Sequence, residues 1–344
     1  MEHIDKLLKS LTLATGVGYS GNVKDVILQE LQRNSIEAHI TADGSVHGVL
    51  NGQRDTSIMI ACHIDEVGFM LSSIDDQGRI SFSEVGNVDV RILPGQEVVV
   101  HGNRELRGYI GAKPPHLVGK DERKKVIPIE KLFVDTGLSV DEVKNSVKVG
   151  DCISFFGMYR KLQGNFRSVK SLDNRSSVAC GILVLKELSK IEDICNVHFV
   201  ATSLEEYYGL GARIHSYRLP IQYAVVIDAT FGEHPDLMEH ECFSLNGGPV
   251  IGRGSTIPEE MSESLVQIAR GLDMAYQVEA MVGATGTDAD NIAFNRDGIP
   301  TCVVGIPLRY MHTPVEVVSL TDIENTKRLV VSYIKQLARK HRRL

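Results

Sequence analysis

Polar side chains follow several short apolar runs that have the composition of buried strands. These side chains are His63 and Asp65 after residues 57–62, Glu205 and Glu206 after residues 198–201, Asp228 after residues 224–227, and His312 after residues 300–306. A further carboxylate, Asp173, precedes the expected start of a helix. Because ligands of open α/β sheets bind at the carboxyl ends of strands, these residues are candidates for one shared site.

Imidazole and carboxylate groups together suit Zn²⁺ and similar divalent ions such as Co²⁺ or Mn²⁺. A thiolate site is not expected, because the six cysteines are scattered and form no Cys-x-x-Cys pair. One ligand from each of the five positions named above already exceeds what one catalytic zinc ion uses. Two ions that share one carboxylate would use them all. The residue types therefore predict a pair of divalent ions with a water between them, and that water needs a base.

Each of these residues also has a simpler interpretation when it is taken alone. A single histidine after a strand is more often a hydrogen-bonded loop residue than a ligand. Asp173 could cap the helix that follows it, and the pair Glu205 and Glu206 could be solvated surface charge. Asp228 is harder to explain in this way, because the apolar residues before it lead into the interior and a carboxylate there needs a partner. Their joint occurrence favours a site.

The elements that must position these residues are read from the periodicity of apolar side chains. Helical spacing covers residues 2–14, 22–34, 178–188 and 260–272, and buried strands are expected at 57–62, 198–201, 224–227 and 300–306. Between about residues 68 and 164, short β-branched runs alternate with turn residues, which is typical of an all-β segment. We therefore expect an α/β fold with a largely parallel open sheet flanked by helices, interrupted by an inserted β-rich barrel or sandwich.

Length and composition exclude several other classes of protein. The 344 residues are 43% hydrophobic and 24% charged, which argues against a mainly disordered or fibrous chain. The formal net charge of −7 repels polyanions, so nucleic acid is not an expected partner. There is no secretory signal pattern and no apolar run of membrane-spanning length, so we expect a cytoplasmic protein that does not bind membranes.

Six short motifs occur together in an order and spacing that cover nearly the whole chain. They are HIDEVG at 63–68, LDNR at 172–175, EE at 205–206, IDAT at 227–230, GTDA at 286–289 and RYMHTPVE at 309–316. Together they resemble the M42 family of dinuclear metalloaminopeptidases, which includes glutamyl aminopeptidases and tetrahedral aminopeptidases. Some members of that family carry the label cellulase or endoglucanase.

The resemblance implies a role for each candidate residue. One metal ion would be held by His63 and Asp228 and the other by Glu206 and His312, with Asp173 bridging both, Glu205 as the general base and Asp65 hydrogen-bonding the His63 imidazole. The ions would be Zn²⁺ or Co²⁺, with Mn²⁺ as a further option, and the water between them would attack the first carbonyl of a peptide. The peptide bond between Asp173 and Asn174 is cis in similar enzymes.

The resemblance also implies a division of the chain and an assembly. Residues 1–67 and 165–344 would form a discontinuous catalytic domain of the zinc-peptidase type, and residues 68–164 an inserted dimerisation domain. Dimers of this kind build a hollow dodecamer, so a homo-oligomer acting on peptide substrates is expected.

One segment departs from the family pattern. Where the family commonly has a glycine and an arginine after the acidic pair, this chain has Tyr208 and Leu210. If that glycine position requires positive φ, Tyr208 would strain the turn. We expect Glu205 and Glu206 to lie in an extended segment, which would point them to different sides.

Two other functions stay open at this point. An altered family member could act as an oligomeric scaffold without turnover, and a glycoside hydrolase would use a pair of carboxylates. The absence of tryptophan and the 6% aromatic content leave few platforms for sugar stacking. The side-chain preference of a peptidase is not fixed by these motifs, although Arg253 and Arg309 could favour acidic residues.

Overall fold

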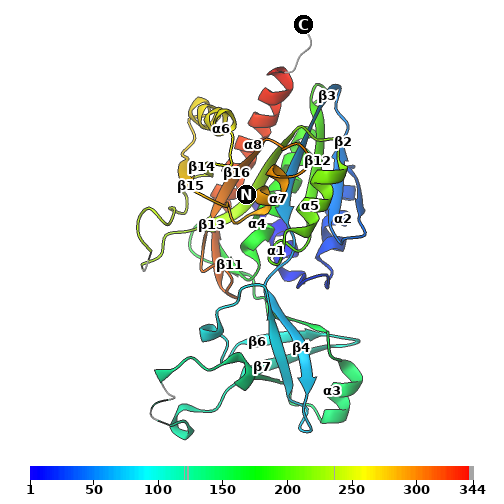
Figure 1. Cartoon of the computed structure of the whole chain (residues 1–344), viewed down its shortest axis with the longest axis vertical. Coiled ribbons are helices and arrows are strands. Elements are labelled where there is room, and N and C mark those ends of the chain that lie inside the picture. The colour runs from blue at the N-terminus through cyan, green and yellow to red at the C-terminus, as the bar shows by residue number, and fades with distance from the viewer. Residues whose placement is uncertain (120, 122–123, 236, 341–344) are drawn as a thin grey trace.

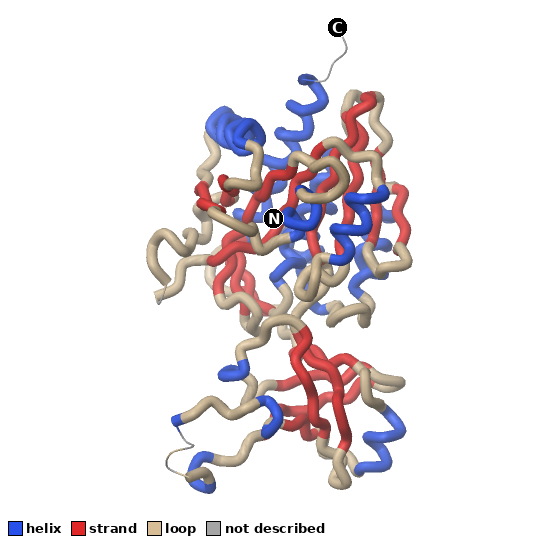
Figure 2. The backbone as a smooth tube through the Cα atoms, in the orientation of Figure 1, coloured by secondary structure: helices blue, strands red, loops and turns tan. Residues whose placement is uncertain are grey.

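The structure is a computed structural model that describes residues 1–119, 121, 124–235 and 237–340. It consists of a large body of sheet and helices and a smaller body of strands, which two neighbouring chain segments connect (Figure 1). The same two bodies are visible in the backbone trace, where the strands of the smaller body curl around one another (Figure 2).

The large body contains an 11-stranded sheet. Its main path runs in the order β1-β2-β12-β3-β13-β16-β17-β11-β10, and β14 joins β16 while β15 joins β14. The strands are β1 (Glu37–Ile40), β2 (Val46–Leu50), β3 (Arg54–His63), β10 (Arg160–Lys161), β11 (Phe166–Val169), β12 (Cys195–Thr202), β13 (Tyr223–Phe231), β14 (Val250–Gly254), β15 (Gln277–Met281), β16 (Thr301–Arg309) and β17 (Glu316–Ser319).

The expectation of a largely parallel sheet holds only for its centre. The strands β12, β3, β13 and β16 run parallel, and β15 runs parallel to β14. The flanking pairs are antiparallel, as in β1 with β2 and β16 with β17. The connections within these two pairs are residues 41–45 and 310–315, which are too short for the crossover that parallel strands need. The sheet is therefore mixed.

Helices cover both faces of the sheet. The α helices of this body are α1 (Glu2–Leu13), α2 (Val23–Arg33), α4 (Leu172–Leu188), α5 (Leu210–Arg218), α6 (Glu259–Gly271), α7 (Asp288–Ala293) and α8 (Leu320–Lys340). In Figure 1, α5 and α7 lie in front of the sheet and α4 lies behind it. Because helices cover both faces, the central strands are buried almost throughout, which explains their continuous apolar runs. No helix in the described part of the chain is long and apolar enough to span a membrane.

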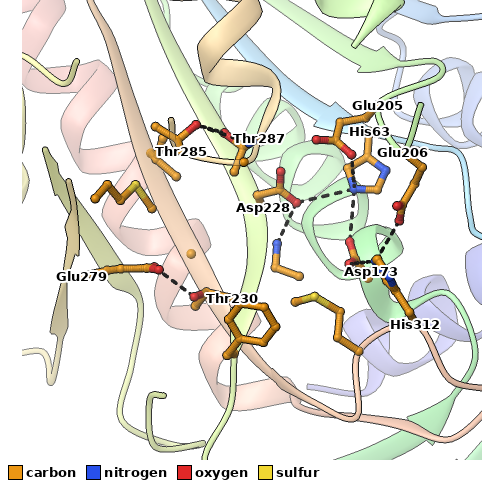
Figure 3. A pocket seen from close by; sticks show the side chains of 17 residues that line it. His63, Asp173, Glu205, Glu206, Asp228, Thr230, Glu279, Thr285, Thr287 and His312 are labelled. Carbon is orange, nitrogen blue, oxygen red and sulfur yellow. Dashed lines mark hydrogen bonds and ion pairs between the residues drawn. The ribbon is translucent and has the colours of Figure 1, made fainter. Parts of the chain in front are cut away.

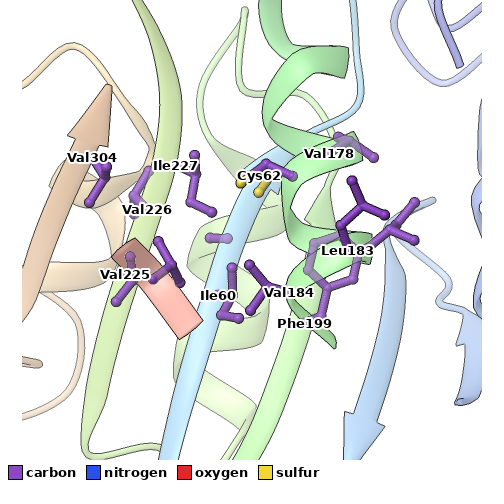
Figure 4. Close-up of a cluster of buried hydrophobic side chains, with 14 of the residues drawn as sticks. Ile60, Cys62, Val178, Leu183, Val184, Phe199, Val225, Val226, Ile227 and Val304 are labelled. Carbon is purple, nitrogen blue, oxygen red and sulfur yellow. The ribbon is translucent and has the colours of Figure 1, made fainter. Parts of the chain in front are cut away.

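The core between α4 and the central strands fixes the helix that carries Asp173. Ile60, Val184 and Phe199 are fully buried there (Figure 4), and each such side chain stabilises the fold by about 1.5–3 kcal/mol. A Cβ atom on Gly181 would lie 2.3 Å from the Phe199 ring, so only glycine permits this close approach of α4 to the sheet. The packing of α4 thus sets the position of its first turn.

The small body is a closed barrel with its own core. Its strands pair in the order β4-β5-β8-β7-β6-β9, all antiparallel. They are β4 (Gly68–Ile74), β5 (Ile80–Val85), β6 (Glu97–His101), β7 (Glu105–Gly111), β8 (Phe133–Asp135) and β9 (Cys152–Phe155). Inside the barrel the ring of Phe69 contacts the rings of Phe82 and Phe155, with centroids 4.9 and 5.3 Å apart.

The inserted segment is not purely β, since it contains the helix α3 (Val140–Ser146). This helix begins with a capping box, in which the Ser139 hydroxyl accepts from the backbone N–H of Glu142 and the Glu142 carboxylate accepts from the N–H of Ser139. The Ser-x-x-Glu pattern is visible in the sequence and could have predicted the helix.

Candidate metal centre

The carboxyl ends of the parallel strands bring the candidate residues together. His63 is the last residue of β3 and pairs with Thr202 at the end of β12, so the acidic pair that follows β12 emerges beside it. Asp228 lies inside β13 rather than after it, because β13 continues its pairing with β16 as far as Phe231. Asp173 reaches the same place from the first turn of α4, and His312 from the turn after β16. All seven candidate residues therefore meet at one edge of the sheet.

Asp173 lies at the centre of this arrangement (Figure 3). One of its carboxylate oxygens is 3.1 Å from Nε2 of His63, and the other is 3.4 Å from Nε2 of His312. Nε2 of His63 is also 3.6 Å from a carboxylate oxygen of Asp228, and Nε2 of His312 is 3.2 Å from Glu206. Asp173 is thus shared between two groups of three ligands, each with atoms within 4.8 Å of one another.

Backbone carbonyls orient both imidazoles. Nδ1 of His63 donates to the carbonyl of Asp65 at 3.2 Å, and Nδ1 of His312 donates to the carbonyl of Asn87 in the inserted segment at 2.9 Å. With a proton on each Nδ1, each Nε2 is left as the free ligand atom that faces the carboxylates. Asn87 was not anticipated from the sequence, because nothing in the sequence indicates that the inserted segment reaches this site.

Asp65 acts differently from the expectation. Its carboxylate is 3.7 Å from Nδ1 of His63, which is too long for the predicted hydrogen bond. The two carboxylate oxygens instead accept from the backbone N–H groups of Glu205 and Glu206, at 3.0 and 3.1 Å. Asp65 therefore orients His63 through its backbone carbonyl and holds the acidic pair through its side chain.

Glu316 is a second carboxylate of this kind, although it was not among the candidate residues. It is 2% exposed, and its two oxygens accept from the backbone N–H groups of His312 at 2.8 Å and Asp173 at 3.1 Å. One side chain thus joins the loop of His312 to the first turn of α4. A signal was available, since Glu316 is an acid flanked by Val315 and Val317 that must find a buried partner.

The turn that carries the acidic pair also differs from the expectation. Residues 205–208 form a helical turn rather than an extended segment, and the N–H of Tyr208 donates to the carbonyl of Leu204 at 3.1 Å. The left-handed residues are Leu204, with φ 57°, and Gly209, with φ 62°. Tyr208 is not among the residues with positive φ, so the predicted strain at this position is wrong. The peptide bond between Asp173 and Asn174 is cis, as the resemblance implies.

The buried acids carry more negative charge than the site compensates. Burial, followed by the neighbouring carboxylates, raises the pKa of Glu205 to about 10, and burial also raises the pKa values of Glu206 and Asp228. Burial opposes the charged form of His312, but its hydrogen bonds with Asp173 and Glu206 outweigh burial and raise its pKa to about 11. Among the described residues that line the site, four carboxylates face two imidazoles and no lysine or arginine, a set that fits divalent ions, which would supply positive charge.

These side chains line one end of a cavity of about 290 Å³. The cavity extends from the two imidazoles past Asp228 to Thr230 and the side chain of Glu279 (Figure 3). Among the described residues, no lysine or arginine lines it. Arg253 and Arg309, which could have favoured acidic substrates, instead form ion pairs with Glu263 and Glu233 outside the cavity.

Comparison with known proteins places this geometry in context. Residues 44–329 match the model of the family described as M42 glutamyl aminopeptidase. A lysyl aminopeptidase from Pyrococcus furiosus is 28% identical, covering 96% of this chain and 97% of that protein. A TET aminopeptidase from a marine sediment archaeon of the Thaumarchaeota is 30% identical with a TM-score of 0.92, covering 98% of this chain and 97% of that one. Pyrococcus horikoshii TET1 peptidase, which can assemble into a tetrahedron or a large octahedral shell, is 28% identical with a TM-score of 0.83, covering 96% of this chain and 99% of that one.

Proposed function

The chain belongs to the M42 family of aminopeptidases, and we propose that it removes N-terminal residues from peptides with two divalent ions held in the cavity described above. The observation that carries the proposal is the shared position of Asp173, whose two oxygens face one imidazole each. One ion would be held by His63 and Asp228 and the other by Glu206 and His312, with Asp173 between them.

Such ions, when bound, lower the pKa of water and polarise the carbonyl of a peptide. The ligand types suit Zn²⁺ or Co²⁺, and Mn²⁺ is a further option. The Nδ1 atoms of both imidazoles donate to backbone carbonyls, so Nε2 of each ring is the atom that would bind an ion in place of its proton.

Glu205 is the proposed general base. Its side chain is 16% exposed, lines the cavity and places one oxygen 3.8 Å from Nε2 of His63, beside the ligands without being needed to complete either group of three around Asp173. A carboxylate in this position takes a proton from the attacking water and passes it to the leaving amine. Asp65 supports this role, since it fixes the turn by accepting from the backbone N–H of Glu205.

The test compares Glu205→Gln with Asp173→Ala. We expect Glu205→Gln to retain bound metal and to lose most of its turnover of aminoacyl p-nitroanilides, whereas Asp173→Ala loses metal as well. Metal content is measured by atomic emission, and Glu263→Gln on the exposed face of α6 is the matched control. A Glu205→Gln variant that works near the wild-type rate would refute the assigned base.

Changes of substrate and metal distinguish the aminopeptidase from the scaffold and the glycosidase. An aminopeptidase stops working when the α-amine of the substrate is blocked, a scaffold hydrolyses nothing with any added metal, and a glycosidase releases sugar from glucan in the presence of EDTA.

The likeness to Pyrococcus horikoshii TET1 peptidase, which can assemble into a tetrahedron or a large octahedral shell, favours a homo-oligomer. We propose dimers formed through the barrel that build a dodecamer. Light scattering measures the mass of the assembly, and a variant with substitutions on the surface of the barrel should give a smaller one.

A further inference from the structure

The end of the cavity opposite the imidazoles carries one more carboxylate, that of Glu279. It points from β15 toward Thr230 on β13, across the far part of the cavity (Figure 3). One oxygen of Glu279 accepts a hydrogen bond from the Thr230 hydroxyl at 2.9 Å. This acid is separate from the group around Asp173 that could hold metal.

Strand geometry sets how far Glu279 lies from the candidate metal centre. Asp228 and Thr230 are two residues apart on β13 and line the same cavity, which separates them by roughly 7 Å along the strand. On β15 the residues Gln277, Glu279 and Met281 are less exposed than the two residues between them, so Glu279 faces inward. The Glu279 carboxylate, which is hydrogen-bonded to Thr230, therefore lies farther along the cavity than Asp228.

Packing leaves Thr230 little freedom to move away from Glu279. A Cβ atom on Gly305 of β16 would lie 2.8 Å from the Thr230 side chain, so glycine is the residue that leaves room for it. Thr230 is 6% exposed. Its hydroxyl holds one Glu279 oxygen in a defined place at the end of the cavity.

Glu279 lacks the cation that a half-buried carboxylate usually has. Within the described part of the chain, no lysine, arginine or histidine forms an ion pair with it, and burial raises its pKa above the ordinary value. The cavity that it shares with the imidazoles is also lined by the apolar side chains of Met281, Val303 and Met311. A cavity with apolar side chains in its lining and a carboxylate without a cationic partner matches a long aliphatic side chain with a positive head.

We propose that Glu279 binds the cationic head of an N-terminal lysine or arginine, so that the enzyme prefers basic residues at the cleaved position. This inference rests on the proposed aminopeptidase function. A lysine side chain has five bonds of about 1.5 Å from Cα to Nζ and spans roughly 6 Å when extended, which fits the separation along β13. The apolar walls contact its methylene groups, and the Thr230 hydroxyl keeps Glu279 aimed at its ammonium group.

The experiment measures kcat/KM of the metal-loaded enzyme for lysyl, arginyl, methionyl and glutamyl p-nitroanilides. Methionine has an unbranched side chain that is one atom shorter than that of lysine and carries no charge. We expect the wild type to favour the basic substrates and Glu279→Gln to lower kcat/KM for lysyl by at least about tenfold, while methionyl changes by less than about threefold. A merely structural role for Glu279 would lower both substrates equally. Glu263→Gln, an exposed glutamate on α6, is the control.

A second readout does not depend on turnover. Isothermal titration compares the binding of L-lysinamide with that of L-norleucinamide, and Glu279→Gln should remove the preference for L-lysinamide. A wild type that prefers methionyl or glutamyl substrates, with a ratio unchanged in Glu279→Gln, overturns this inference and leaves the aminopeptidase function standing. If no substrate is cleaved, the proposed function fails, and equal affinities for the two amides would then overturn the inference independently.

Discussion

Glu316→Gln perturbs the scaffold of the candidate metal centre without touching a ligand atom. The wild-type carboxylate accepts from two backbone N–H groups, those of His312 and Asp173. A glutamine has one oxygen and one NH₂ group, so one backbone N–H would face a donor instead of an acceptor. A hydrogen bond to a charged group is worth about 1.5–3 kcal/mol.

That loss can be converted into an effect on metal binding. If most of it falls on the ordering of the two loops, the affinity for divalent ions decreases by about 10–100-fold, which is the usual size of the effect when a group supporting metal ligands is changed. We expect kcat at saturating metal to recover to within about threefold of the wild type, because Glu316 contacts backbone groups rather than the space beside Glu205.

The assay is competition with a chromophoric chelator, followed by activity measured against added metal. Glu263→Gln controls for the loss of a glutamate charge elsewhere on the surface. A Glu316→Gln protein that binds metal as tightly as the control would refute the reasoning that this side chain holds the two loops in place. A kcat that stays low at saturating metal would place Glu316 closer to the chemistry than its hydrogen bonds indicate.

Three further predictions concern stability. Lys170→Met leaves the buried carboxylate of Glu66 without its nearest cation. We therefore expect the free energy of unfolding to decrease by about 3–5 kcal/mol and Tm to decrease by about 4–7 °C for a chain of this length. Lys6→Met, which removes an exposed ion pair, should leave Tm unchanged, and equal shifts of the two variants in calorimetry would contradict this. The hydrogen bond from Arg167 holds the pKa of Asp5 well below its ordinary value despite burial, so the pair stabilises the fold above about pH 4 and loses this contribution as the pH falls further. The gap in Tm between the wild type and Asp5→Asn should therefore narrow below pH 4, and a constant gap from pH 7 to pH 3 would argue against it. Chelation of divalent ions should lower Tm and added Zn²⁺ or Co²⁺ should restore it, since the ions offset repulsion among buried carboxylates.

The central strands and their polar ends could be predicted because their signals are local. A run such as residues 58–62 is buried on both faces, so every side chain in it is apolar, and the first polar residue after it marks the edge of the sheet. The same reasoning ended β13 at Ile227, four residues too early, because the strand continues to Phe231 through residues such as Asp228 and Thr230 that line the cavity. When a functional polar residue lies inside a strand, the sequence pattern predicts that the strand ends too early.

Features that depend on distant segments could not be read from the sequence. Asn87 and Glu279 lie in stretches with no motif, and only the tertiary fold brings them to the cavity. The turn at Glu205 was expected to be extended, since nothing in the local sequence indicates the left-handed Leu204 that starts it. Glu316 was within a motif that had been noticed, but its role as an acceptor for two loops depends on contacts across 143 residues of chain.

The arrangement of acceptors bears on whether the chain could be a scaffold without turnover. Asp65 and Glu316 are almost fully buried. Both oxygens of each carboxylate accept hydrogen bonds from backbone N–H groups in segments that contain candidate ligands. Burying an ionised group without full compensation costs several kcal/mol, and the site also buries the carboxylates of Asp173 and Asp228. A scaffold would be more stable with apolar residues at these positions. Divalent ions are the simplest compensation, so the presence of all four acids supports the proposed metal centre over a scaffold without one.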